Sequence, residues 1–223
     1  TTWVLSNHDI IRHATRFGLP QVEDFFAWYG KNRLTAKPDV ELGTARARAM
    51  TMLLLALPGS TYLYQGEELA LQEVLDIPAE QMQDPQFFRN PEVGISRDGC
   101  RVPLPWTKTG SSFGFGSGGS HLPQPAWYGS VSVEAQDGAK GSTLELYREL
   151  IALRKTLLAP EDITWHRNWL GPRVLHFSRP GGWHCVTNFG NKPIKLPAGK
   201  VLAASQPLLD GKLPANATAW LKA

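Results

Sequence analysis

A strongly apolar segment between two short β-rich runs sets the fold class of this chain. Residues 44–57, TARARAMTMLLLAL, predict a helix that begins at Thr44 as its N-cap and ends before Pro58. The second half of this helix is apolar on nearly all sides, which predicts burial against a sheet. Short β-rich runs at residues 2–6 and 60–65 flank it. This order of strand, connection, helix and strand predicts a parallel βαβ unit.

Polar side chains follow the first of these runs at once. Asn7, His8 and Asp9 come directly after the apolar residues, and Arg12 stands three positions further on. In parallel α/β folds, ligands bind where strands reach their C-terminal ends, so Asp9 is the first candidate for chemistry. No sheet precedes this strand in the sequence. We therefore expect the chain to be the C-terminal part of a larger enzyme.

Irregular connections surround the βαβ elements. Residues 21–42 predict an irregular connection with short helical pieces, and residues 66–141 form a long connection rich in Pro and Gly. Loops of this length in compact domains usually have a role, such as forming an active-site wall. For residues 110–120, GSSFGFGSGGS, a flexible spacer is the equally plausible alternative. The pair Ser142 and Glu145 forms a capping box, which predicts a helix reaching about Leu158.

The composition changes after this helix. Short strand-like runs separated by Gly, Pro and Asn predict an antiparallel β-domain; they are residues 173–178, 183–189, 193–196, 200–204 and 217–221. The sequence Pro-Gly-Gly at 180–182 predicts a hairpin turn between the first two runs. We expect one domain over residues 1–160 and a second over residues 161–223.

Charge and composition weigh against several kinds of partner. The chain has 23 Lys and Arg against 20 Asp and Glu, with a net charge of +3 and no dense basic run. This predicts no binding to nucleic acid or to a membrane surface, and the longest apolar stretch, residues 50–57, is too short to span a bilayer. The two cysteines, Cys100 and Cys185, lie far apart, and no CxxC or His/Cys cluster indicates a metal site. Reduced thiols and a cytoplasmic location are expected.

Several segments, in order, resemble glycoside hydrolase family 13, the α-amylase superfamily. They are SNHD with Arg12, YQGEE at residues 64–68, SRDGCRVPLPW at residues 96–106, and residues 133–136 and 146–154 leading through the last helix. The second and third are similar to the α-glucosidase and oligo-1,6-glucosidase branch. NHD alone would be weak evidence for this family, but several of its motifs in this order are specific to it.

The resemblance implies an α/β architecture joined to an all-β one. It places strands seven and eight of a (β/α)8 TIM barrel at residues 2–8 and 60–65, and the eighth helix at residues 142–158. An antiparallel β-sandwich-like C-domain follows. Barrel strands one to six are not in this sequence.

The resemblance also implies roles for particular residues. Retaining glycosidases use one carboxylate as nucleophile and a second as acid/base, and in this family both lie on strands four and five, outside this chain. Asp9 is similar to the third essential carboxylate, which binds the sugar 2- and 3-hydroxyls and stabilises the transition state. His8 would donate to a sugar hydroxyl, Arg12 would contact Asp9 or the sugar, and Arg97 would contact the substrate. The chemistry needs no cofactor.

Each of these assignments has a structural alternative. His8 could be a satisfied strand-end histidine, and Arg12 could form a surface ion pair of little energetic value. Trp106 could be a platform for a sugar ring or part of the loop packing.

Four charged residues carry a structural expectation. Asp98 and Arg101 are expected to hold the long loop in shape. Glu67 and Glu68 could pass for a catalytic pair, but the resemblance makes them braces of the barrel rim.

The function predicted first is that of a retaining α-glucosidase, of which this chain is the C-terminal part. It would hydrolyse the terminal non-reducing bond of an α-linked gluco-oligosaccharide or disaccharide such as maltose or isomaltose, and the chain alone would be inactive. One alternative is a non-catalytic sugar- or partner-binding subunit with the amylase fold, and another is a transglycosylase or isomerase of the family. Two barrel strands leave open edges, which predicts pairing with the missing N-terminal portion or self-association.

Overall fold

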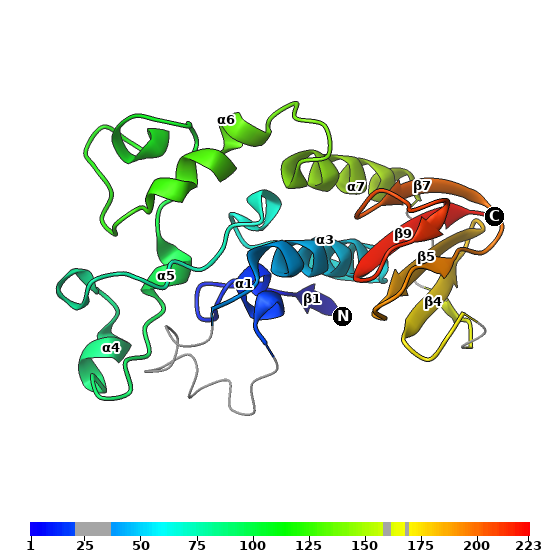
Figure 1. Cartoon of the computed structure of the whole chain (residues 1–223), viewed down its shortest axis with the longest axis horizontal. Coiled ribbons are helices and arrows are strands. Elements are labelled where there is room, and N and C mark those ends of the chain that lie inside the picture. Colours follow the sequence, from blue (N-terminus) through cyan, green and yellow to red (C-terminus); the bar gives the residue numbers. More distant parts are fainter. Residues whose placement is uncertain (21–36, 158–161, 168–169) are drawn as a thin grey trace. The chain divides into compact units, whose positions relative to one another are not determined.

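The structure, a computed structural model, describes residues 1–20, 37–157, 162–167 and 170–223 (Figure 1). Its contacts form two units. The first contains Thr1–Val4, Ala45–Tyr62 and Leu146–Ala223, and the second contains Leu5–Thr44 and Leu63–Glu145. The predicted domains, residues 1–160 and 161–223, follow another division and stay a prediction. The irregular connection predicted for residues 21–42 lies mostly outside the described residues.

The first unit contains the predicted βαβ strands. β1 (Thr2–Val4) pairs in parallel with β2 (Ser60–Tyr62), with Trp3 opposite Thr61. The helix α3 (Val40–Ala56) connects them along the chain, and its residues from Ala45 onward belong to this unit. The parallel pairing confirms the βαβ prediction, although both strands are shorter than the β-rich runs. Trp3 Nε1 donates to the carbonyl oxygen of Pro58 at 2.6 Å, which ties β1 to the end of the helix.

The start of α3 differs from the prediction. Thr44 was expected to be the N-cap, but the helix begins at Val40. Asp39 Oδ1 accepts a hydrogen bond from the backbone nitrogen of Leu42 at 2.9 Å, as an N-cap side chain does. The carboxylate of Asp39 therefore provides an acceptor for a backbone nitrogen of the first turn, and Thr44 lies inside the helix.

The predicted capping box before the next long helix is half formed. α7 (Thr143–Leu157) is preceded by Ser142, whose Oγ accepts from the backbone nitrogen of Glu145 at 3.2 Å. In a complete box the Glu side chain would turn back to the backbone nitrogen of the cap residue. Instead, Glu145 Oε1 accepts from the backbone nitrogen of Gly138 at 3.0 Å, which fixes the preceding turn.

The C-terminal part of the first unit is antiparallel, as predicted. One sheet has the order β3-β4-β5-β9-β7, and a second pairs β6 with β8. The strands are β3 (Thr164–Trp165), β4 (Val174–Arg179), β5 (Trp183–Asn188), β6 (Ile194–Lys195), β7 (Lys200–Ala204), β8 (Lys212–Leu213) and β9 (Ala217–Lys222). Arg179 lies opposite Trp183 where β4 turns into β5, which confirms the predicted hairpin. β3 and β8, with two residues each, were not predicted.

The larger sheet has apolar clusters on both faces. One cluster joins side chains of α3 and α7 to the sheet, including Met52, Leu150, Phe177, Cys185 and Trp220. The other face carries a second cluster, which includes Val186, Leu213, Ala219 and Leu221. Neighbouring residues along β5 thus point to opposite faces, as the pleat requires. Apolar side chains therefore cover both faces of this sheet.

The second unit contains short helices, with no β-strand among its described residues. They are α1 (His13–Gly18), η1 (Glu67–Leu69), η2 (Ala79–Gln81), α4 (Pro85–Arg89), α5 (Asp98–Arg101), η3 (Ser111–Gly114), η4 (Ala126–Val131) and α6 (Val133–Gln136). An apolar cluster that includes Leu69, Leu71, Val102, Leu104 and Tyr128 holds these pieces together. The long connection predicted for residues 66–141 is therefore a packed segment built around its own core.

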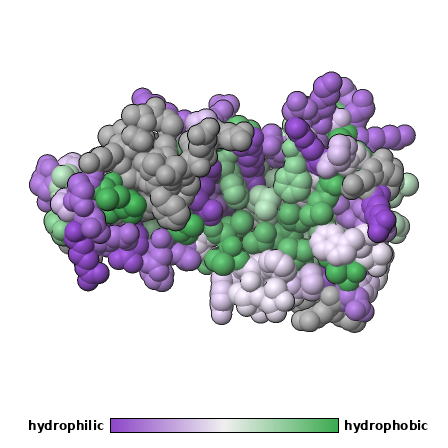
Figure 2. Space-filling view, turned by 90° about the horizontal axis from the view of Figure 1, so that it is seen from below, coloured by the Kyte–Doolittle hydropathy of each residue, from purple (hydrophilic) through white to green (hydrophobic). Residues whose placement is uncertain are grey.

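Some apolar side chains of the first unit are exposed. Tyr62 on β2 is 68% exposed and Val4 on β1 is 48% exposed. Figure 2 shows hydrophobic residues gathered on one face of the molecule. Among the described residues β1 and β2 pair only with each other, so each strand has an open outer edge. No helix in the described part of the chain is long and apolar enough to cross a membrane.

Candidate active site

Asp9 lies in a turn of the second unit with its carboxylate half exposed. The backbone nitrogen of Asp9 donates to Asn7 Oδ1 at 2.8 Å, which shapes the turn. His8 Nε2 lies 3.4 Å from Asp9 Oδ2, and the two side chains are 69% and 52% exposed. The two predicted site residues thus lie side by side, and both side chains are accessible to solvent.

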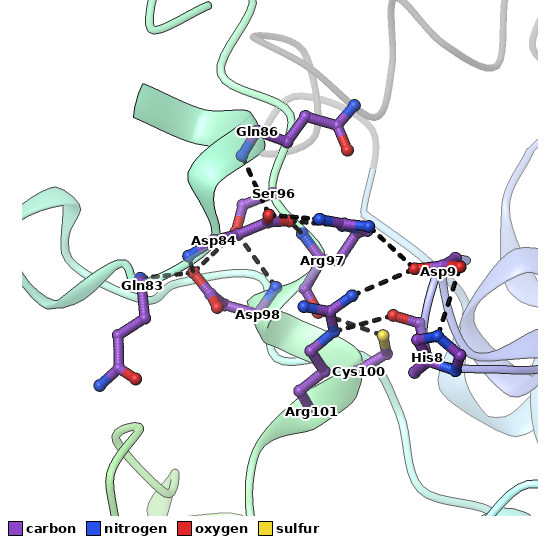
Figure 3. A network of polar contacts seen from close by, with 10 residues as sticks. All are labelled: His8, Asp9, Gln83, Asp84, Gln86, Ser96, Arg97, Asp98, Cys100 and Arg101. Atoms are coloured by element: carbon purple, nitrogen blue, oxygen red, sulfur yellow. Dashed lines mark hydrogen bonds and ion pairs between the residues drawn. The ribbon is translucent and has the colours of Figure 1, made fainter. Parts of the chain in front are cut away.

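Two arginines of one short segment converge on a single oxygen of Asp9. Arg97 Nη1 lies 2.9 Å and Arg101 Nη2 lies 3.1 Å from Asp9 Oδ1, as Figure 3 shows. Arg101 Nε also donates to the backbone carbonyl of His8 at 2.8 Å. Arg97 is the N-cap residue of α5 and Arg101 is the last residue of that helix. The two guanidinium groups, one helical turn apart, therefore reach the same carboxylate.

A second carboxylate holds Arg97 in this orientation. Asp84 Oδ1 accepts from Arg97 Nη2 at 2.7 Å, and Asp84 Oδ2 accepts from Arg97 Nε at 2.8 Å. This is the bidentate pairing that guanidinium and carboxylate groups form best. The hydrogen bonds from Arg97 hold the pKa of Asp84 far below its usual range, and Asp84 is only 1% exposed. The hydrogen bond to Asp84, and to a lesser extent the one to Asp9, raises the pKa of Arg97.

The predicted loop-holding role of Asp98 agrees with its contacts. Asp98 Oδ2 accepts from the backbone nitrogens of Gln83 and Asp84, at 2.8 and 3.0 Å, and from Ser96 Oγ at 2.9 Å (Figure 3). Asp98 therefore joins the two segments that carry Asp84 and Arg97. Arg101, for which the same role was expected, instead reaches Asp9 and His8.

Arg12 does not make the contact predicted for it. The side chain was expected to meet Asp9 or the sugar, or else to form a surface ion pair, but it is only 2% exposed. Its Nη1 donates to the carbonyl of Gln65 and its Nη2 to that of Cys100, each at 2.9 Å. Its guanidinium also lies 5.1 Å from the ring centre of Tyr64. Since donors of this buried group are directed to backbone carbonyls, Arg12 joins the loop of Cys100 to the segment after β2.

Glu67 belongs to a buried polar group. Its Oε1 lies 3.8 Å from His13 Nδ1, and His13 Nδ1 lies 2.9 Å from Ser6 Oγ. Burial raises the pKa of Glu67 to about 7. Burial, followed by the charges of Arg16 and Arg12, lowers the pKa of His13 to about 3.

Glu68 has a separate local contact. Its Oε2 accepts from the backbone nitrogen of Gly66 at 2.8 Å. The carboxylates of Glu67 and Glu68 therefore both contact neighbouring groups of the fold, and the expected bracing of a barrel rim stays a prediction.

Sequence reasoning missed two residues of this site. Asp84 precedes Pro85, and an Asp-Pro pair at a helix start indicates an N-cap, which Asp84 also is. That pattern gives no hint of its contact with Arg97, 13 positions away. The contact of Arg101 with Asp9 spans 92 positions, and only the shared spacing of Arg97 and Arg101 on one helical turn could have suggested it. Trp106 is half-exposed, so both its predicted roles stay open.

Three comparisons identify relatives of this chain. A family model described as alpha amylase, catalytic domain, matches residues 1–160. The probable alpha-glucosidase of Rhizobium meliloti (strain 1021) is 33% identical over 69% of this chain and 24% of its own length. The salivary alpha-glucosidase of Anopheles gambiae is 31% identical over 99% of this chain and 32% of its own length.

A solved structure agrees with these relatives. The alpha-glucosyl transfer enzyme XgtA matches 99% of this chain and 39% of its own length, with 31% identity and a TM-score of 0.73. The trehalose-6-phosphate hydrolase of Bacillus licheniformis, at 19% identity and a TM-score of 0.71, shows the same fold. This chain spans between 24% and 43% of the length of these proteins. The matches show that the chain belongs to the α-amylase family, glycoside hydrolase family 13.

Proposed function

We propose that this chain is part of a retaining α-glucosidase that hydrolyses the terminal non-reducing bond of short α-linked gluco-oligosaccharides. The observation that carries the proposal is the half-exposed carboxylate of Asp9, one oxygen of which is held by Arg97 and Arg101. Family membership supports glycoside chemistry, and the relatives named alpha-glucosidase support this branch.

The proposed role of Asp9 is to stabilise the transition state. Arg97 and Arg101 fix the carboxylate in one orientation, and Asp9 Oδ2 stays on the side of His8. Hydroxyl groups at C2 and C3 of the sugar donate to this carboxylate, and those bonds strengthen as positive charge develops at the anomeric carbon. His8 donates to a neighbouring hydroxyl, and Arg97 adds a contact from the opposite side. These contacts therefore stabilise the transition state more than the bound substrate.

The nucleophile and the acid/base come, in this proposal, from a part of the protein outside this chain. The motif resemblance supports this, because it makes β1 and β2 the seventh and eighth barrel strands and puts the reacting carboxylates on strands four and five. The exposed apolar side chains and open edges of β1 and β2 support a companion proposal. The remaining barrel strands, or a second copy of this chain, cover them.

Substitution of Asp9 tests the proposal. Asp9→Asn in the full-length protein keeps the shape of the side chain and removes its charge, so kcat on maltose or isomaltose should fall on the order of 10² to 10³-fold or more. Asp210→Asn makes the same chemical change at an exposed turn and should leave kcat unchanged. Retention of most of the activity by Asp9→Asn would refute the role given to Asp9. Hydrolysis of a chromogenic α-glucoside by the purified 223-residue chain would refute the placement of the reacting carboxylates.

Glucosyl transfer is a second candidate reaction. The likeness to the alpha-glucosyl transfer enzyme XgtA, at 31% identity over nearly the whole chain, favours it. Both reactions share the proposed role of Asp9 and differ in whether water or a hydroxyl accepts the glucosyl group. Product analysis after incubation with maltose, isomaltose and sucrose separates them, since hydrolysis releases glucose while transfer or isomerisation gives new glucosides. Sugar binding without any turnover would instead indicate a non-catalytic subunit.

A further inference from the structure

Three of the six histidines of the chain meet on the larger sheet of the first unit. His176 lies on β4 and His184 on β5, and His166 follows β3 directly. The backbone nitrogen of His166 donates to the carbonyl of His176 at 2.9 Å, which extends the pairing of β3 with β4. Adjacent strands therefore bring together residues that are eight to eighteen positions apart.

The strand register places these side chains on one face. Ser178 lies opposite His184, and His176 lies opposite Val186, so His176 and His184 are diagonal neighbours across the β4–β5 pair. The residues that directly follow them in sequence, Phe177 and Cys185, belong to the apolar cluster on the other face. The imidazole rings of His166 and His176 stack with centroids 4.2 Å apart, and that of His184 lies 5.4 Å from that of His166.

The ring nitrogens lie at spacings close to those of metal ligands. One nitrogen of each ring lies within 4.8 Å of the others, and His176 Nε2 is 3.0 Å from His184 Nδ1. Tetrahedral zinc with bonds of 2.0–2.1 Å separates its ligand nitrogens by about 3.3 Å. The His176–His184 pair is already near this spacing, and a nitrogen of His166 lies within 4.8 Å of both.

We propose that His166, His176 and His184 bind a divalent transition-metal ion, with zinc as the reference case. Imidazole nitrogens suit zinc, copper(II) and nickel(II), whereas calcium and magnesium prefer oxygen ligands. Three histidines leave a fourth position for water. The ion replaces the His176–His184 hydrogen bond and joins β3, β4 and β5.

The surroundings of the cluster fit this proposal. Ser178 Oγ lies 2.8 Å from His166 Nε2 and fixes that ring by a hydrogen bond, as outer-shell groups do at metal sites. His176 is buried, while His166 and His184 are partly exposed, so an ion can enter past two rings. The sequence predicted no metal site because the three histidines share no short-range spacing and meet only through strand pairing. The site belongs to a different unit from Asp9 and has no part in the proposed glucoside chemistry.

Zinc binding by the full-length protein, prepared without a histidine tag and treated with a chelator, tests the proposal. Calorimetry with Zn²⁺ should show a site whose affinity falls in His166→Gln. Zinc should also raise the melting temperature of the parent protein, because a ligand that binds the folded state stabilises it. His121→Gln, at an exposed histidine outside the cluster, is the matched control and should bind zinc like the parent. We expect His166→Gln and His184→Gln to weaken this binding at least about tenfold.

Each outcome decides the matter. Absence of zinc binding by the parent, or binding that His166→Gln and His184→Gln leave unchanged, overturns the proposal. An equal loss in His121→Gln overturns it as well, because it would indicate adventitious surface binding. If His184→Gln does not fold, His166→Gln still tests the proposal, because His166 is partly exposed and its replacement disturbs less packing. The visible spectrum of the Co²⁺-loaded parent, compared with that of His166→Gln, gives a second readout of imidazole ligation.

Discussion

At the scale of single residues, the position of Arg97 depends on Asp84 as much as on Asp9. Two atoms of the guanidinium bond to Asp84 and a third reaches Asp9. Asp84 is buried and Asp9 is half-exposed, so the anchor is the partner farther from solvent. A ligand that displaces Arg97 from Asp9 would therefore still find the arginine held in place.

Asp84→Asn should weaken this anchor while keeping the α4 cap, because Asn also caps helices well. Loss of the charged bidentate pair should cost about 1.5 to 3 kcal/mol of stability and lower kcat/KM on maltose in the full-length enzyme. In Arg97→Lys the bidentate geometry is already lost, so adding Asp84→Asn should lower kcat/KM further by much less. Additive effects in this double-mutant cycle would contradict the coupling. Asp210→Asn is the control for the chemical change.

Glu67 gives a pH-dependent test of the buried polar group. Burial raises its pKa from 4.5 to about 7, so the folded protein keeps a proton that the unfolded chain releases in this window. Stability from this group is complete below pH 4.5 and is lost as the pH rises toward 7, by at most about 3 kcal/mol. His13, whose pKa is lowered from 6.5 to about 3, acts in the opposite direction between those values.

Glu67→Gln removes only the Glu67 contribution. The melting temperature of Glu67→Gln minus that of the parent protein should therefore rise between pH 5 and pH 8. Thermal unfolding at several pH values would measure this difference. A difference that stays constant with pH would contradict the raised pKa.

At the scale of elements, α3 begins one turn before the predicted cap. Thr44 was the predicted N-cap, whereas the structure uses Asp39. Asp39→Ala should destabilise the protein by about 1 kcal/mol, because the Leu42 backbone nitrogen loses its acceptor. Thr44→Ala should cost clearly less. Urea unfolding of the two variants measures the difference, and a larger loss in Thr44→Ala would contradict the observed helix start.

Elements with strong local signals were predictable from the sequence. The parallel βαβ strands, the 180–182 hairpin and the Ser142 cap each follow from apolar periodicity or turn chemistry within a few residues. Asp9 was a candidate from its position directly after an apolar run, and the family motifs added His8 and Arg97. Arg12 was placed wrongly and Asp84 was missed, because burial and pairing over long separations leave no local pattern.

At the scale of the whole molecule, the two-stranded sheet of β1 and β2 is the least self-sufficient feature. A two-stranded sheet is marginal by itself, and its open edges are templates for further strands. The isolated chain should therefore self-associate, as light scattering coupled to size-exclusion chromatography would detect. Tyr62→Lys places a charge on exposed β2 and should reduce the association. A monomer at all accessible concentrations would contradict the proposed covering of these strands.

The spacing of Arg97 and Arg101 sets a limit on change in this part of the chain. The two lie one helical turn apart, and the three residues between them fix that interval. One inserted or deleted residue would turn Arg101 by about 100° and carry it away from Asp9. Replacements within 98–100 are restricted as well, because Asp98 accepts hydrogen bonds from Gln83 and Asp84 and a Cβ at Gly99 would clash with the carbonyl oxygen of Val74. Among variants of this protein, those that keep the Asp9 contacts should hold the length of this segment constant.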